Sequence, residues 1–150
     1  MSRMKTAVAL TIGVFAAHAW AGEFFERDGA AIRGYDPVAY FTDGKATRGS
    51  PEYTTQYQGS TFQFSSREHR DAFAADPEKY APQYRGYCAY GTSTGYKAAV
   101  DPSEFTIVNG KLYLNYNEDV RKTWSKDILG YITKADARWP EVSRQTKVIE

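Results

Sequence analysis

The sequence predicts a small single domain of the α+β class, with two antiparallel β-hairpins and short helices packed on one side of them. The chain has 150 residues, which suits one ordinary domain and is too short for two. Two pairs of alternating, β-rich segments flank Gly59 and Asn109-Gly110, which are residues that favour tight turns. Helix-start signals follow each pair, so helices are expected beside the hairpins.

Residues 1–21 have the three-part composition of a secretory signal peptide. Arg3 and Lys5 precede an apolar run from Ala7 to Ala17, and the segment ends in Ala19-Trp20-Ala21. The apolar run is too short to span a bilayer comfortably. We therefore expect cleavage after Ala21, a periplasmic or secreted location, and no stable membrane insertion of the processed chain.

Removal of this segment changes the charge and the set of metal-ligating residues. Without Arg3 and Lys5, Lys and Arg fall from 19 to 17 against 18 Asp and Glu, so the formal charge becomes −1. This balance argues against nucleic acid or an acidic membrane surface as the partner, because such binding needs clustered positive charge. The processed chain keeps one histidine, His69, and one cysteine, Cys88. A metal ion or a small molecule is the expected partner, and no protein partner is indicated.

The first half of the processed chain predicts a turn, a hairpin and two short helices. Pro37 removes a backbone donor, so residues 31–41 are expected to form an edge strand or a short helical turn. Residues 53–57 and 61–64 alternate and predict a hairpin around Gly59. Ser65 is the expected N-cap of the next helix, and Asp76-Pro77 is expected to begin another.

The second half predicts a loop, a second hairpin and two more helices. Residues 82–99, which include Cys88, lack a clean period and are expected to form a loop with a short extended piece. Asn109-Gly110 is the preferred turn of a hairpin between residues 105–108 and 112–114. Asn117 and Asp127 are expected to cap helices, the second ending at Pro140. We expect residues 141–150 to be a frayed polar tail, and we find no internal repeats.

Several of these segments resemble the YHS domain family over about residues 30–90. The segments are Tyr35-Asp36-Pro37-Val38-Ala39-Tyr40-Phe41, the aromatic strand with its Ser-capped helix, and Asp76-Pro77-Glu78-Lys79-Tyr80. Gly86-Tyr87-Cys88-Ala89-Tyr90 and Gly110-Lys111-Leu112-Tyr113-Leu114-Asn115 resemble an exported bacterial subgroup of that family, some of whose members are labelled selenoproteins, which would fit selenocysteine at the position of Cys88. The resemblance extends over residues 22–140. It implies a small domain described as a candidate metal-binding module and found beside copper transporters and some oxygenases.

The candidate metal ligands are His69 and Cys88. Where many members of the family have cysteine, this chain has Ala39, Ser65 and His69. Thiolate and imidazole together suit Cu(I) or Zn(II), and Cu(I) tolerates the low coordination number of two ligands, so copper is the expected metal. Five further residues are candidates for a pocket or for contacts that support the ligands: Tyr35, Asp36, Ser65, Tyr87 and Tyr90.

Four other interpretations stay open at this point. His69 also fits a structural imidazole beside Phe73, and Cys88 fits an inert buried thiol. A thiol-redox protein using Cys88 and a non-catalytic interaction or ligand-binding module are the alternatives to metal binding. The sequence has no nucleophile elbow, no phosphate loop, no dinucleotide-binding glycine pattern and no His-Glu-x-x-His helix. We therefore assign no catalytic residue and favour a non-enzymatic role.

Overall fold

The computed structural model describes residues 23–150, so the predicted signal peptide lies outside the described residues. The first half contains eight elements, namely β1 (Glu26–Arg27), β2 (Ala30–Ala31), η1 (Ile32–Gly34), α1 (Ala39–Thr42), β3 (Ser50–Tyr57), β4 (Ser60–Phe64), α2 (Arg67–Ala75) and α3 (Pro77–Tyr80). The second half contains η2 (Gln83–Gly86), α4 (Ala89–Thr94), β5 (Lys97–Ala98), β6 (Asp101–Val108), β7 (Lys111–Asn115), α5 (Glu118–Ser125), α6 (Ile128–Val142) and β8 (Val148–Ile149).

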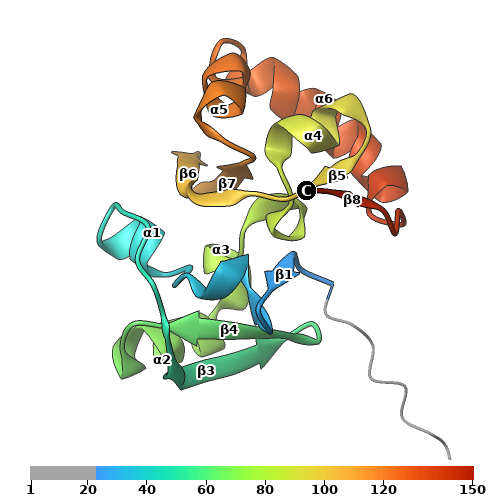
Figure 1. Ribbon diagram of the computed structural model, residues 1–150. Helices are drawn as coiled ribbons and strands as arrows, with labels where there is room; N and C mark the ends of the chain where they lie inside the picture. Colours follow the sequence, from blue (N-terminus) through green and yellow to red (C-terminus); the bar gives the residue numbers. More distant parts are fainter. Residues whose placement is uncertain (1–22) are drawn as a thin grey trace, which may run out of the picture.

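The α+β prediction with two antiparallel hairpins and short helices is confirmed. The predicted hairpins are β3–β4 and β6–β7, and each forms its own two-stranded sheet. Helices α4, α5 and α6 gather on the side of β6–β7 that faces away from β3–β4 (Figure 1). Within residues 23–150, no helix combines the length and the apolar character that a membrane crossing requires.

Both hairpins turn through two residues in left-handed backbone conformation. Gln58 and Gly59 have φ values of 49° and 77°, and Asn109 and Gly110 have values of 51° and 74°. This is the type I′ geometry that matches the twist of paired strands, and it explains why Gly stands second in each turn. The Asn-Gly turn that the sequence predicts is therefore confirmed.

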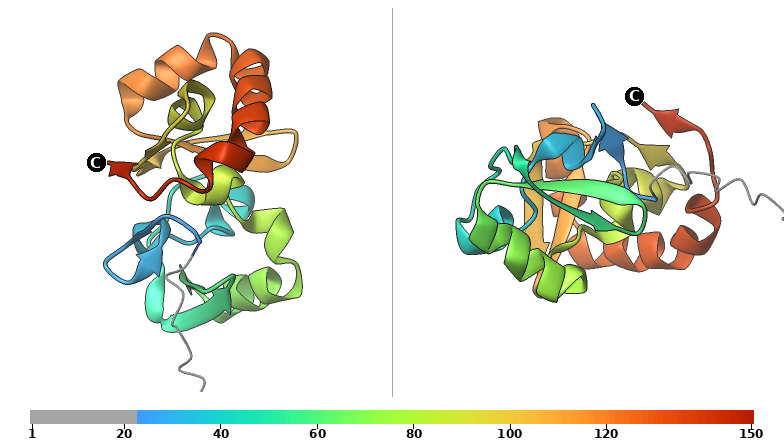
Figure 2. Two further views of the ribbon diagram at one scale, coloured as in Figure 1. Left: turned by 90° about the vertical axis from the view of Figure 1, so that its right-hand side faces the viewer. Right: turned by 90° about the horizontal axis from the view of Figure 1, so that it is seen from below.

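The elements of the chain occur twice in the same order, which corrects the expectation of no internal repeat. The first unit (residues 32–80) runs from η1 through α1, the β3–β4 hairpin and α2 to α3. The second unit (residues 84–131) runs from η2 through α4, the β6–β7 hairpin and α5 into α6. The two units are stacked, with β3–β4 in the lower one and β6–β7 in the upper one (Figure 1), and Figure 2 shows the same separation in its left view.

The correspondence extends to details of the backbone. In both hairpins an eight-residue strand pairs with a five-residue strand, with a register shift between Ser50 and Thr54 in one and between Asp101 and Phe105 in the other. The N-cap residue of the following helix stands two residues after the second strand in each unit, as Ser66 or as Asn117. The repeat is hard to recognise in the sequence because few side chains are shared.

Each unit also begins with the same unusual turn. Ile32, Arg33 and Gly34 have φ values of 53°, 54° and 81°, and their counterparts Tyr84, Arg85 and Gly86 have values of 53°, 52° and 82°. A left-handed conformation is costly for residues other than glycine, so two such runs in corresponding places show a shared backbone plan.

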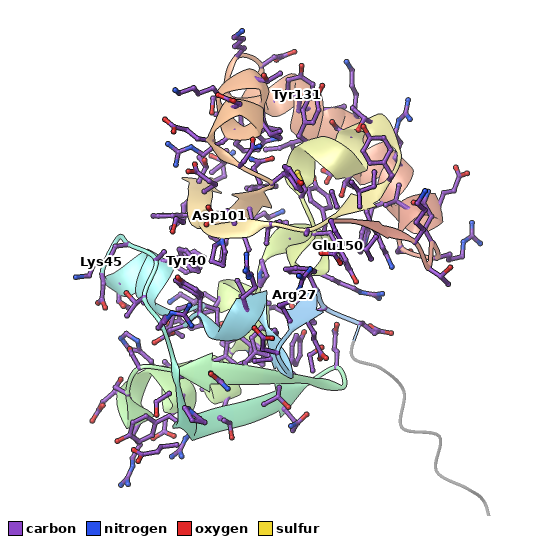
Figure 3. All side chains as sticks on the ribbon, viewed as in Figure 1. Arg27, Tyr40, Lys45, Asp101, Tyr131 and Glu150 are labelled. Carbon is purple, nitrogen blue, oxygen red and sulfur yellow. The ribbon has the colours of Figure 1, made fainter. Side chains whose placement is uncertain are left out.

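One hydrophobic core joins the units. Its largest cluster contains Phe62, Phe64 and Phe73 from the first unit together with Leu112 and Leu114 from the second. The hydroxyl of Tyr40 also donates to the carbonyl of Pro102 across the boundary at 2.7 Å, and Figure 3 shows Tyr40 on the side facing Asp101. Since buried apolar area is the main stabilising contribution, the two units form one folded body.

A second, smaller cluster lies between β7 and the helices of the second unit. It contains Tyr84, Ala89, Tyr113, Trp124 and Ala135. The rings of Tyr113 and Trp124 lie 5.6 Å apart, as the rings of their counterparts Phe62 and Phe73 lie 4.7 Å apart. The helix after each hairpin therefore packs an aromatic side chain on the same strand position.

Three local predictions were wrong. The side chain that caps α2 belongs to Ser66, because Ser65 donates instead to Asp36. Residues 82–99 are not mainly loop, since they contain η2, α4 and β5. The C-terminal residues are not frayed: α6 continues through Pro140 to Val142, and β8 pairs in parallel with β5. A proline in the last turn removes only one backbone hydrogen bond, and strand pairing over such a distance has no local signal.

Candidate functional site

The polar centre of the first unit is a buried aspartate that accepts hydrogen bonds from five donors. The Asp-Pro turn directs Asp36 back over α1, where Oδ1 accepts from the backbone N–H of Val38 at 2.9 Å and of Ala39 at 3.2 Å. Oδ2 accepts from the backbone N–H and the hydroxyl of Ser65, at 2.9 and 2.7 Å, and lies 2.6 Å from Nδ1 of His69. Asp36 is fully buried, so the hydrogen bonds compensate for the loss of water.

His69 connects this buried carboxylate to the surface. It stands in the first turn of α2, where its backbone N–H donates to the Ser66 hydroxyl at 3.1 Å. Because Nδ1 faces a carboxylate oxygen, Nδ1 carries the proton and Nε2 presents the lone pair of the neutral ring. The side chain is 18% exposed, and Nε2 lies 3.3 Å from Oγ1 of Thr42, which is 3.0 Å from Oδ1 of Asp43.

Cys88 occupies a different environment in the second unit. It caps α4, with Sγ accepting from the backbone N–H of Gly91 at 3.4 Å and lying 3.5 Å from Oδ1 of Asn115. The residue is 1% exposed, and burial raises the pKa of the thiol although backbone N–H groups of Gly91, Tyr116 and Tyr90 oppose the shift. The thiol therefore stays protonated at neutral pH, which is the less reactive form.

The structure does not bring His69 and Cys88 together. The hydrogen-bonding partners of His69 belong to α1, the turn before it and the start of α2, whereas those of Cys88 belong to α4 and β7. Helices α2 and α4 lie in opposite units in Figures 1 and 2. Among residues 23–150, no group of three His, Cys, Asp or Glu side chains is arranged to hold a metal ion. The donor set therefore does not fit a metal centre made from His69 and Cys88.

The remaining predicted residues divide between the units. Ser65 belongs to the Asp36 centre, and Tyr35 lies beneath the guanidinium of Arg48 at 5.3 Å. Tyr87 packs edge-on against a core phenylalanine, and burial raises the pKa of its hydroxyl. Tyr90 packs edge-on against Tyr131, with the ring centroids 5.3 Å apart, and lies beside Cys88.

A pocket beside Cys88 was only partly foreseen from the sequence. Its volume is about 190 Å³, and it is lined by Cys88, Tyr90, Gly91, Tyr96, Ala98, Tyr116, Val120 and Ile149. Of these residues, the sequence indicated Cys88 as a candidate ligand and Tyr90 as a candidate pocket residue. It did not identify Tyr116, Val120 or Ile149, and it also missed Thr42 beside His69. Tyr116 and Val120 correspond to Ser65 and His69 in the repeat, a relation that the structure shows and the sequence does not.

Comparison with known proteins finds a family match within the first unit and the residues that follow it. Residues 38–84 match the family model of the YHS domain, while searches of the curated proteins and of the solved structures return no match. The matched segment includes Thr42, Ser65 and His69 and ends before Cys88. This chain is therefore similar to the YHS domain over residues 38–84, a segment that covers most of the first unit.

Proposed function

We propose that this protein is an exported YHS-domain module that binds a transition metal, with copper preferred, through Nε2 of His69. Cys88 takes no part in this site. The observation that carries the proposal is the 2.6 Å contact between Oδ2 of Asp36 and Nδ1 of His69. Metal-ligating histidines commonly donate their second ring N–H to a carboxylate, which fixes the tautomer and the orientation of the ring. Here the carboxylate is buried and held by four other donors, so the ring is positioned before a metal arrives.

The donors near Nε2 indicate the oxidation state. The Thr42 hydroxyl lies beside Nε2 of His69 and is hydrogen-bonded to the Asp43 carboxylate. The described residues around Nε2 include no thiolate, which is the ligand that would favour Cu(I). Imidazole and oxygen donors suit Cu(II), which also stands highest among divalent first-row metals in affinity for such sites. His69, Asp43 and water would hold the ion, and a bound copper ion would supply Lewis acidity or one-electron chemistry. A site with so few protein ligands should not be needed for folding.

Two further considerations support the assignment. Residues 1–21 have the composition of a signal peptide, which suits an exported protein; a secreted form that retains their mass would exclude it. The burial of Cys88 and the raised pKa of its thiol disfavour a thiol-redox role, since thiolate is the reactive form. The resemblance to domains found beside copper transporters points in the same direction by analogy.

The test is a Cu(II) titration of the chain from Gly22 onward, which contains every helix and strand described above. We expect one site whose electron paramagnetic resonance spectrum shows a single imidazole nitrogen among oxygen donors. His69→Ala should abolish this signal, and the matched control Cys88→Ser should leave it unchanged. Equal binding by His69→Ala would overturn the proposal. A sulfur-to-copper absorption band that Cys88→Ser removes would overturn it in favour of a thiolate site.

A further inference from the structure

We propose that the pocket beside Cys88 binds a small uncharged aromatic molecule, at the place in the second unit that corresponds to the Asp36–His69 centre in the first. All residues that line the pocket lie outside the matched YHS segment. It does not depend on the metal proposal, because none of its lining residues contacts His69 in the hydrogen-bond network.

The correspondence rests on backbone positions in the two units. Asp36 and Cys88 each accept from the backbone N–H three residues further along, in Ala39 and in Gly91. His69 and Val120 each occupy the third position of a helix, and the backbone N–H of each donates to its N-cap side chain. Ser65 and Tyr116 each directly precede that N-cap residue.

The two places have opposite chemistry. In the first unit Asp36, Ser65 and His69 join in a hydrogen-bonded cluster. In the second unit the same positions hold Cys88, Tyr116 and Val120, which line the pocket together with Gly91. The second unit has Val120 where the first has a histidine, and Cys88 where the first has an aspartate. It therefore has no polar cluster at this place, and a largely apolar pocket lies there instead.

The size and lining of the pocket define the class of ligand. Its volume of about 190 Å³ slightly exceeds that of an apolar protein cavity of roughly 150 Å³ that is known to bind benzene. Tyr90, Tyr96 and Tyr116 contribute aromatic surface, and none of the lining residues carries a charge. A charged molecule would lose its hydration without a compensating partner, whereas a single uncharged ring can be buried favourably.

The rim of the pocket is unusually apolar for an exposed surface. Large hydrophobic side chains that are clearly exposed within residues 23–150 are Tyr96, Ile107, Tyr116, Leu129 and Ile149. Three of these five, Tyr96 at 41%, Tyr116 at 36% and Ile149 at 39%, line this pocket. Their concentration at one concave place is typical of a ligand site rather than of scattered surface residues. Ile149 reaches the pocket because β8 pairs with β5.

The experiment uses phenol and indole as probes, with benzoate as the charged comparison. We expect both neutral probes to shift the amide signals of Tyr96, Tyr116 and Ile149 in an NMR titration of the chain from Gly22 onward, and benzoate to leave them in place. Val120→Phe should fill the pocket and weaken indole binding at least about tenfold. The matched control Ile107→Phe changes an exposed residue on β6 outside the pocket and should bind as the parent does.

Other outcomes separate this proposal from the metal site. His69→Ala should bind indole normally, since the two places belong to different units. Indole should also slow alkylation of Cys88 in the unmodified protein, which tests the site without any substitution. The proposal is overturned if no amide near the pocket shifts with either neutral probe, if Val120→Phe binds indole as tightly as Ile107→Phe, or if benzoate binds as well as phenol.

Discussion

Asp36 is a buried carboxylate whose oxygens contact only hydrogen-bond donors. A residue at this position must therefore accept several hydrogen bonds. An asparagine there would place an N–H₂ group among the N–H and O–H groups that now point to Oδ2. We expect Asp36→Asn to lower the free energy of unfolding by about 2–4 kcal/mol, because buried donors lose their acceptor. Urea denaturation measures the change.

The control for this substitution is Asp43→Asn. The Asp43 side chain is exposed and its partner is the Thr42 hydroxyl, so the change should be within about 0.5 kcal/mol. Similar losses for the two variants would contradict the role assigned to Asp36. At this scale the sequence indicated Asp36 and Ser65 among five candidates for a pocket or for support of the ligands. It could not predict that Cys88 lies away from His69, since that depends on how distant elements pack.

At the scale of single elements, the β3–β4 turn is less well adapted than the β6–β7 turn. Gln58 takes a left-handed φ of 49° in the position that Asn109 occupies in the second hairpin. Asparagine tolerates this conformation better than glutamine does, so Gln58→Asn should raise the free energy of unfolding by about 0.5–1 kcal/mol. The melting temperature should rise accordingly.

The comparison for this variant is Gln56→Asn, an exposed position within β3 rather than in its turn. Asparagine is disfavoured in strands, so this change should not stabilise the protein. An equal gain for both variants, or none for Gln58→Asn, would show that the turn conformation is not limiting.

Elements with strong local signals were the ones that the sequence predicted well. The Asn109-Gly110 turn and the helix caps at Asn117 and Asp127 depend on neighbouring residues, and all three are present. Helix α4 was missed because its cap is a cysteine, a residue that rarely takes this role. The pairing of β8 with β5 was missed because it joins residues far apart in the chain.

At the scale of the whole molecule, the shared core predicts a single unfolding transition. Leu112 and Leu114 pack with Phe62 and Phe64, so separation of the units would expose apolar surface on both. Fluorescence of Trp124 in the second unit and of Trp139 on α6 follows that part of the molecule, and the His69 ring signal in NMR spectra follows the first unit. We expect the two probes to give the same urea midpoint. A first transition seen only by one probe would mean that the units are independent.

Because of the repeat, the chain contains two units that share one backbone arrangement and differ in most side chains. Two glycines that the units share, at Gly34 and Gly86 and at Gly59 and Gly110, have a positive φ that glycine satisfies. Where the units differ most in chemistry, as at His69 and Val120, the residues line the two candidate sites. Comparison of the two units thus distinguishes glycine positions that the backbone requires from positions at which each unit has its own candidate site.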